Sequence, residues 1–236
     1  MEELGVDMSS LFDRSYTCPV CGNNFTSKQV KTSAIRAKER KKDFHALFSG
    51  ENPTYYGVIC CPKCGYAKFE NDFIKELDSS DRLIIEQAIS SHWRTQNFCE
   101  ERTTEIAINV HRIALASYKV HNAKQSIIGK LYLRLAWFNR ELGQDEEAKR
   151  YTELALSTFL SSYEMERFEE VPEKELEIIY LIGELNRQLG NYKEAIRWFD
   201  MTIRHEFAYK NRLLKQYAKE QWALSVEENN RFKQGR

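Results

Sequence analysis

Four cysteines in two Cys-x-x-Cys pairs carry the most specific chemistry in this sequence. The pairs are Cys18–Cys21 and Cys61–Cys64, and each has a proline after its first cysteine. Thiolates three residues apart around a tight turn can both reach one metal ion at roughly 2.3 Å. Two such turns supply a closed set of four sulfur ligands, for which Zn²⁺ is the expected ion. We therefore predict one structural zinc ion held by these four side chains.

Two other side chains, Cys60 and His45, could take part in this chemistry. Cys60 could compete as a ligand, but its spacing of four to Cys64 favours Cys61, and we expect Cys60 to end a strand and point to the opposite side. His45 is either a polar loop residue or a substitute ligand or functional side chain. Cys99 stands alone and is expected to be a buried core thiol.

The spacer between the two pairs is 39 residues long, which exceeds the usual 15 to 20 or so. An elongated ribbon accommodates that length. The alternative is a redox pair or thiols without metal. A thioredoxin-like redox motif needs an α/β pattern around it, and the sequence has none.

Composition narrows the class of protein. The 236 residues fit one large or two small domains, and 35 basic and 35 acidic side chains cancel, so no global field attracts nucleic acid or membrane. No apolar run approaches the roughly 18 residues of a membrane span. The acidic start at Met1–Gly5 lacks the pattern of a signal peptide. We expect a cytoplasmic protein, in which thiols stay reduced and six cysteines are better explained by metal than by disulfides.

The elements that must position the cysteines change in type along the chain. Residues 1–16 are expected to be a short lead-in. Residues 25–60 carry β-branched and aromatic residues without helical periodicity, which predicts two or three short strands. Beyond Asp78 the apolar spacing is helical. The predicted fold is mainly α, with a small zinc-ribbon-like β module at 1–77 followed by an α-helical tetratricopeptide-like repeat domain at 78–236.

A direct repeat supports the helical domain. Phe138–Gly143 with Glu147–Arg150 recurs 47 residues later as Leu185–Gly190 with Glu194–Arg197. Each copy predicts a helix, a Leu-Gly stop, a short turn and a second helix, because glycine after the last apolar residue is typical of a helix C-terminus. The pattern is similar to the 34-residue tetratricopeptide repeat.

The repeat also departs from that pattern. About 13 residues are inserted around 161–172, and only two copies are clear. We expect helices at 81–95 and 104–120 to supply a degenerate first unit and a helix at about 211–228 to cap the far end.

Stacked helix pairs form an extended concave surface, lined in tetratricopeptide-like stacks by the first helix of each pair. Exposed Trp, Tyr and Arg side chains dominate protein-binding hot spots. The alternative is that Trp137 and Tyr180 pack against a neighbouring helix or the zinc module. The expected partner-binding residues are Lys130, Trp137, Arg140, Glu177, Tyr180, Glu184 and Arg187.

A basic stretch in the spacer offers a second kind of partner. Cationic ribbons on zinc modules can bind phosphate backbones, and Tyr55 and Tyr56 could stack on bases. The alternative is a solvated loop that keeps the edge of the ribbon from pairing with neighbours. The candidate nucleic-acid contacts are Lys28, Lys31, Arg36, Lys38, Arg40, Lys41 and Lys42.

Further motifs join these features into one string. They are Cys18-Pro-x-Cys21 with Phe25, Asp43-Phe44-His45, Asn52-Pro53-x-Tyr55-Tyr56, Cys61-Pro-x-Cys64-Gly65-Tyr66-Ala67 and Leu131–Trp137. With them, nearly the whole chain resembles a bacterial family of unknown function, number 2225 in the domain-of-unknown-function series. The resemblance implies a zinc-ribbon-like start, a tetratricopeptide-like remainder and metal ligands at the four paired cysteines. It implies no activity.

These observations favour a cytoplasmic, zinc-stabilised adaptor or scaffold that binds a protein partner through its helical face. No catalysis is expected, because nothing in the sequence resembles a nucleophile with its base, a phosphate loop or an open metal site. The alternative is a nucleic-acid-associated factor that uses the basic residues between 28 and 42.

Overall fold

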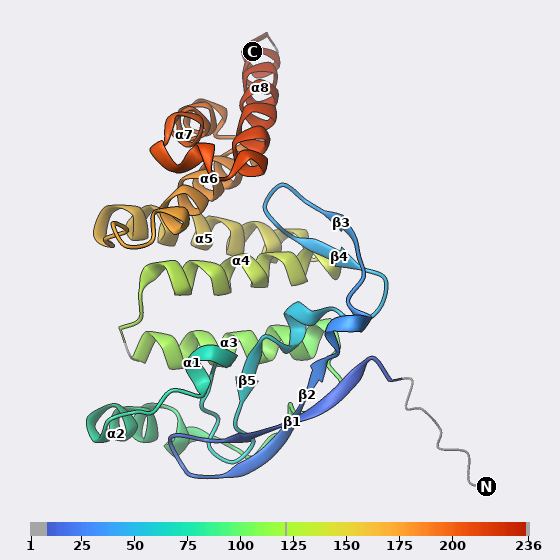
Figure 1. Ribbon diagram of the computed structural model, residues 1–236, viewed down its shortest axis with the longest axis vertical. Coiled ribbons are helices and arrows are strands. Elements are labelled where there is room, and N and C mark those ends of the chain that lie inside the picture. Colours follow the sequence, from blue (N-terminus) through green and yellow to red (C-terminus); the bar gives the residue numbers. More distant parts are fainter. Residues whose placement is uncertain (1–8, 121, 235–236) are drawn as a thin grey trace, which may run out of the picture. The chain divides into compact units, whose positions relative to one another are not determined.

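The computed structural model describes residues 9–120 and 122–234, which form two compact units (Figure 1). Unit 1 comprises Met1–Arg40 and Ala46–Asn122, and unit 2 comprises Lys41–His45 and Ala123–Arg236. The units divide the chain at a different place from the boundary expected after residue 77. The acidic start at residues 1–5 lies outside the described residues.

The strands of unit 1 form antiparallel pairs. β1 (Leu11–Thr17) pairs with β2 (Asn24–Val30), β3 (Ala37–Arg40) with β4 (Ala46–Phe48), and β5 (Val58–Cys60) with β6 (Ala67–Phe69). One Cys-x-x-Cys pair lies in the β1–β2 connection and the other in the β5–β6 connection. The β region expected at the N-terminal end is therefore confirmed, and each cysteine pair is held by a two-stranded ribbon.

The expected lead-in was wrong for its second half, because residues 11–17 form β1. Leu11 and Tyr16 are the buried residues of this strand, while the side chains between them are exposed. This pattern lacks the strict alternation by which a half-buried strand is recognised in a sequence. Leu11 packs inside the unit, whereas Phe12 is exposed.

The α-helices among the described residues of unit 1 are α1 (Glu70–Phe73), α2 (Ser79–Ala88) and α3 (Thr104–Val120). α3 packs against β5 and β6. Its Ser117 hydroxyl accepts a hydrogen bond from the Ala67 N–H at 3.3 Å, and its Tyr118 hydroxyl accepts one from the Phe69 N–H at 3.1 Å. α3 thus supplies partners for the backbone of β6. The helix at 104–120 is confirmed, and α2 and α3 belong to unit 1.

We expect Tyr118→Phe to lower the free energy of unfolding of unit 1 by about 1–3 kcal/mol, because a buried hydrogen-bonding group is lost. The Tyr118 hydroxyl is buried, accepts from Phe69 and donates to Asp72 Oδ2 at 2.6 Å. Urea unfolding measures the change. Tyr209→Phe is the matched control, since Tyr209 is exposed. Equal unfolding midpoints for the two variants would show that these hydrogen bonds contribute nothing to stability.

Unit 2 contains two helix pairs and a last long helix (Figure 1). The first pair is α4 (Gln125–Glu141) with α5 (Asp145–Met165), and the second is α6 (Pro172–Gln188) with α7 (Tyr192–Arg204). α8 (Arg212–Gln234) packs against α6 and α7. The inserted residues of the first copy lengthen α5 to 21 residues, against 13 in α7, and form the connection to α6.

The two copies of the repeat end their first helices in the same way. Gly143 and Gly190 adopt left-handed backbone conformations, with φ of 68° and 78°. Each glycine N–H bonds the carbonyl three residues earlier, at 3.1 and 3.0 Å, and each following N–H bonds the carbonyl five residues earlier, at 2.9 Å in both copies. This is the hydrogen-bond pattern of a Schellman motif, which needs a residue that tolerates positive φ. The sequence repeat is thus a structural repeat.

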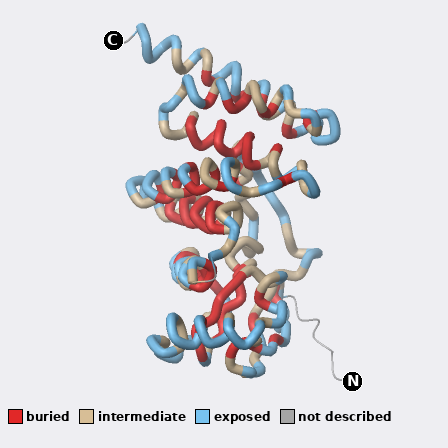
Figure 2. Tube along the Cα trace, turned by 90° about the vertical axis from the view of Figure 1, so that its left-hand side faces the viewer, coloured by how far each residue is buried: buried red, intermediate tan, exposed pale blue. Residues whose placement is uncertain are grey.

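The buried residues of unit 2 lie along its helices, and Figure 2 colours them red on the Cα trace. Gly183 allows α6 to approach α7 closely, because an added Cβ would lie 2.9 Å from the Phe199 ring. Gly129 does the same for α4 and α5, where the distance to the Phe159 ring would be 2.7 Å. Both glycines are therefore sites of close helix packing.

Candidate metal centre and helical face

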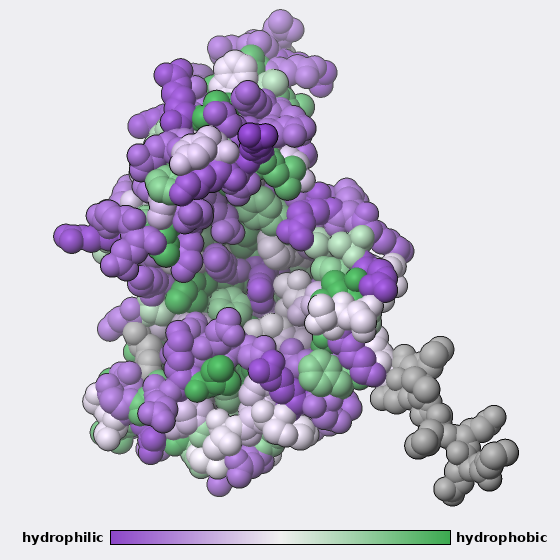
Figure 3. Space-filling view, in the orientation of Figure 1, coloured by the Kyte–Doolittle hydropathy of each residue, from purple (hydrophilic) through white to green (hydrophobic). Residues whose placement is uncertain are grey.

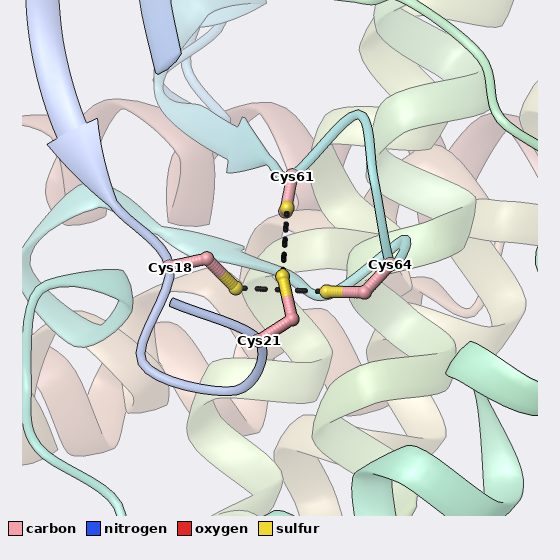
Figure 4. A group of neighbouring side chains, drawn as sticks. All are labelled: Cys18, Cys21, Cys61 and Cys64. Carbon is pink, nitrogen blue, oxygen red and sulfur yellow. Dashed lines mark hydrogen bonds between the residues drawn. The ribbon is translucent and has the colours of Figure 1, made fainter. Parts of the chain in front are cut away.

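The structure brings the four paired cysteines together (Figure 4). The Sγ atoms of Cys18 and Cys64 are 3.5 Å apart, those of Cys21 and Cys61 are 3.7 Å apart, and all four lie within 4.8 Å of one another. Four sulfurs at roughly 2.3 Å from one ion, at the corners of a tetrahedron, would be separated by about 3.8 Å. The type, number and spacing of these donors are therefore compatible with a four-coordinate metal site.

The two cysteine turns have the same backbone geometry. Gly22 and Gly65 follow the second cysteine of each pair with φ of 68° and 75°, and their N–H groups bond the carbonyls of Cys18 and Cys61 at 2.9 and 3.0 Å. Gly65 has a second constraint, because an added Cβ would lie 2.4 Å from the Trp93 ring. The positive φ values explain why glycine occupies both positions.

Proximity changes the protonation of these thiols. Hydrogen bonds from Cys18 and Cys64 lower the pKa of Cys61, and the shared contact with Cys61 raises the pKa of Cys18. The contact with Cys18 likewise raises the pKa of Cys64. The Cys61 thiolate is stabilised by hydrogen bonds from its neighbours, and its negative charge disfavours deprotonation of Cys18 and Cys64. A divalent cation removes that opposition, since thiolate ligands bind metal in their deprotonated form.

The remaining cysteines and His45 lie outside this cluster. Cys60 is the last residue of β5, and Cys60 and Cys99 are both buried. Burial raises the pKa of each of these two thiols. As expected, Cys60 ends a strand and lies outside the cluster, and Cys99 is a buried thiol. His45 belongs to unit 2, where its Nε2 lies 2.7 Å from Glu141 Oε1, so the structure gives it a role other than metal ligation.

The basic stretch is less uniform than its sequence indicates. Lys28 forms an ion pair with Asp13 at 3.0 Å, and Lys42 belongs to unit 2, where it pairs with Glu220 at 2.6 Å. Lys31 is half-buried. The exposed cations are Arg36, Lys38, Arg40 and Lys41.

The expected base-stacking role of Tyr56 is wrong, because this side chain is 1% exposed. Its hydroxyl accepts the Arg102 N–H at 3.1 Å and donates to Glu51 at 3.0 Å. Tyr55 is half-buried, with its hydroxyl 2.7 Å from that of Thr104. Both tyrosines therefore form their contacts within unit 1. On the surface, most residues of the face drawn in Figure 3 are hydrophilic.

The helical face of unit 2 is covered by the chain's own residues Lys41–His45, here called the 41–45 turn. Asp43 is completely buried in this unit. Its carboxylate accepts hydrogen bonds from Trp137 Nε1 at 3.1 Å and from Arg140 Nη2. A buried carboxylate is costly unless it is paired in this way. α4 therefore provides a specific site for an acidic side chain.

Two ring contacts continue the same surface. Phe44 stacks on Tyr180 of α6 with ring centroids 5.3 Å apart, and the Tyr180 hydroxyl donates to the Lys42 carbonyl at 2.8 Å. The His45 ring lies parallel to Trp137 at 5.4 Å. Of the residues expected to bind a partner, the structure thus brings Trp137, Arg140 and Tyr180 together around one peptide segment.

The other expected contacts are placed differently. Glu184 is buried and pairs with Arg187 at 2.9 Å, and Arg187 also reaches Glu228 of α8. The hydrogen bonds to Glu184 raise the pKa of Arg187. Lys130 and Glu177 are half-buried. The expected open face is therefore covered, and Tyr180 and Glu184 are interior residues.

Sequence reasoning missed that residues 43–45 bind this face. Asp43-Phe44-His45 belonged to the motif string of the resemblance, but the string does not say what these side chains contact. Their partners Trp137, Glu141 and Tyr180 lie 94, 96 and 136 residues away along the chain.

The ribbons, the four-cysteine cluster and the helix pairs together define a protein with a candidate metal-binding β unit and a helical-repeat unit. The chain belongs to the family described as "Uncharacterized protein conserved in bacteria (DUF2225)", whose model matches residues 11–225. The resemblance seen in the sequence is thereby confirmed.

Other comparisons add little. An "Uncharacterized protein" of Borreliella burgdorferi is 25% identical over 160 residues, which cover 58% of this chain and 55% of that protein. The match thus spans about half the length of this curated relative. No solved structure matches. Among the described residues, none of the helices has the length and apolar character needed to cross a membrane.

Proposed function

We propose that this protein is a cytoplasmic adaptor with a structural zinc ion, and that it binds a protein partner through the face formed by α4, α6 and α8. The observation that carries the proposal is the 41–45 turn. Its acidic, aromatic and imidazole side chains each meet a matched group on this face. A surface that binds one peptide segment by such contacts has the chemistry needed to bind another.

Zinc is the ion that best fits the cluster, and its role is structural. Four thiolates fill a tetrahedron and leave no position for a substrate or a water molecule. Such sites stabilise a fold and do not catalyse, so the adaptor proposal assigns no reaction to the protein. We expect one zinc ion per chain, as measured by elemental analysis of the purified protein.

A second candidate function is binding of nucleic acid. Arg36, Lys38 and Arg40 are exposed side chains in and beside β3, and phosphate contacts of this kind weaken steeply with salt. The triple variant Arg36→Glu, Lys38→Glu and Arg40→Glu removes this cationic patch and leaves the helical face intact.

Affinity capture of the tagged protein from its own cells tests both candidates. One half of the lysate is treated with nuclease, and the triple variant is run beside the wild type. For an adaptor we expect protein partners that survive nuclease and are retained by the triple variant. Loss of all partners in both arms, with nucleic acid recovered from the untreated wild type, would favour nucleic-acid binding and sink the adaptor proposal.

A further inference from the structure

The 41–45 turn meets the helical face through one matched contact for each of its last four side chains. The groups that receive these side chains come from α4, α6 and α8, and we call them the turn-binding face: Trp137, Arg140, Glu141, Tyr180, Tyr217 and Glu220. We propose that this face is selective for a turn with the order base, acid, aromatic, imidazole. Residues 42–45 are its internal occupant, and a partner protein binds by presenting a turn of the same chemistry in their place. This inference rests on the proposed adaptor function and specifies its ligand.

Charge complementarity fixes the order of the first two positions. Lys42 lies 2.6 Å from Glu220 and 3.8 Å from the centre of the Tyr217 ring, so α8 offers an acidic and aromatic site for a cation. Asp43 meets the opposite environment on α4, where Arg140 and the Trp137 N–H are donors. Exchanging the two positions would bring an acidic side chain to Glu220 and a basic one to Arg140. Like-charge contacts of this kind exclude wrong partners.

The next two positions are selected by ring contacts. The third residue stacks on Tyr180, which itself packs against Phe199 in the core of unit 2 and is therefore a fixed platform. The fourth residue lies flat on Trp137 and reaches Glu141 at its ring nitrogen. An imidazole satisfies both requirements, because it is planar and carries a nitrogen that can donate a hydrogen bond.

The backbone of the turn makes its replacement feasible. Hydrogen bonds within the turn, from Lys41 N–H to His45 O at 2.7 Å and from Phe44 N–H to Lys41 O at 3.0 Å, give it a defined shape. Phe44, however, has a φ of 69°, which is unfavourable for a bulky residue. The free-energy cost of this backbone conformation weakens the binding of the internal turn to the turn-binding face. A tethered segment still competes at an effective concentration on the order of millimolar, so it excludes weak competitors.

The test uses a cyclised, fluorescent peptide of residues 37–48 and the full-length protein. A loop-replaced variant carries Lys42→Ser, Asp43→Ser, Phe44→Gly and His45→Ser. We expect the peptide to bind this variant at least 10-fold more tightly than the wild type, as measured by fluorescence anisotropy, because the internal competitor is gone. A control peptide with Asp43→Asn, and the loop-replaced protein with Arg140→Met added, should each bind at least 10-fold more weakly.

Circular dichroism and metal content establish that the variants are folded. If the loop-replaced variant does not fold, the single substitution Asp43→Asn in the otherwise intact chain takes its place. This substitution weakens the docking of the internal turn and leaves its other side chains unchanged. Absence of peptide binding to a folded variant, or equal binding to variant and wild type, would overturn the inference. A dimer that forms with rising concentration and requires Asp43 would identify a second copy as the occupant, and would also overturn it.

The same peptide separates this inference from the adaptor proposal. Added to the capture experiment, it should displace partners from the loop-replaced variant. Partners that are captured but resist the peptide would leave the adaptor standing and refute the selective face. Peptide binding without any captured protein would support the selectivity of the face and refute the adaptor.

Discussion

Cys64→Ser is expected to release the metal ion and unfold the ribbons of unit 1, the largest effect that we predict for a single substitution. The four sulfurs lie within 4.8 Å of one another, so the loss of one ligand opens a site that the other three cannot close. Metal binding in small cysteine sites contributes on the order of 10 kcal/mol or more to folding. Elemental analysis gives the metal content, and Trp93, which donates to the Pro62 carbonyl beside the second pair, reports local unfolding by fluorescence.

Cys99→Ser is the matched control for this experiment. Cys99 is also buried in unit 1, but it lies outside the four-cysteine cluster. Its substitution should leave one metal ion bound and lower stability only modestly. Equal metal content in the Cys64→Ser and wild-type proteins would refute the assignment of Cys64 as a ligand.

The four-cysteine cluster could be predicted from the sequence because the geometry of each Cys-x-x-Cys turn is local. A Cys-x-x-Cys turn places two thiols on one ion without help from distant residues, and a glycine at positive φ follows each pair. The ends of α4 and α6 could be predicted equally well, because the hydrogen bonds that end each helix at its Leu-Gly sequence join residues at most five positions apart. Each cysteine turn and each helix end depends on residues within about six positions of one another, whereas the meeting of the two cysteine pairs joins residues 40 and 46 positions apart and was expected because a four-ligand site needs both pairs.

Features that depend on distant contacts could not be predicted. α3 has an ordinary helical pattern, and nothing in that pattern shows that Ser117 and Tyr118 would bond the backbone of β6. β1 was missed because it is buried at only two of its seven positions. The 41–45 turn has the composition of a solvated loop, and its basic neighbours suggested nucleic acid. Its burial arises from partners on α4, α6 and α8 that lie about 100 or more residues away.

The second large effect is expected for Arg140→Met, which leaves the Asp43 carboxylate buried with Trp137 as its remaining side-chain donor. Removing one partner of a buried ion pair costs about 3–5 kcal/mol, because the other charge stays in a low-dielectric environment. The 41–45 turn can avoid this cost by leaving the face, so the measured loss of stability cannot exceed the free energy that docks the turn. We therefore expect a smaller change in global unfolding and a large increase in amide hydrogen exchange at residues 41–45.

Adding Asp43→Asn to Arg140→Met distinguishes loss of the charge pair from loss of packing. Asparagine is neutral and its carbonyl can still accept the Trp137 Nε1–H, so the burial penalty falls while the shape of the turn is kept. The double variant should exchange its 41–45 amides more slowly than Arg140→Met alone. If the 41–45 amides of both variants exchange equally fast, Arg140 acts through its packing. The turn-binding face then does not select the acidic residue of the turn by its charge. Slower exchange in the double variant would show that the turn-binding face selects a carboxylate through Arg140, the property on which recognition of an outside partner depends.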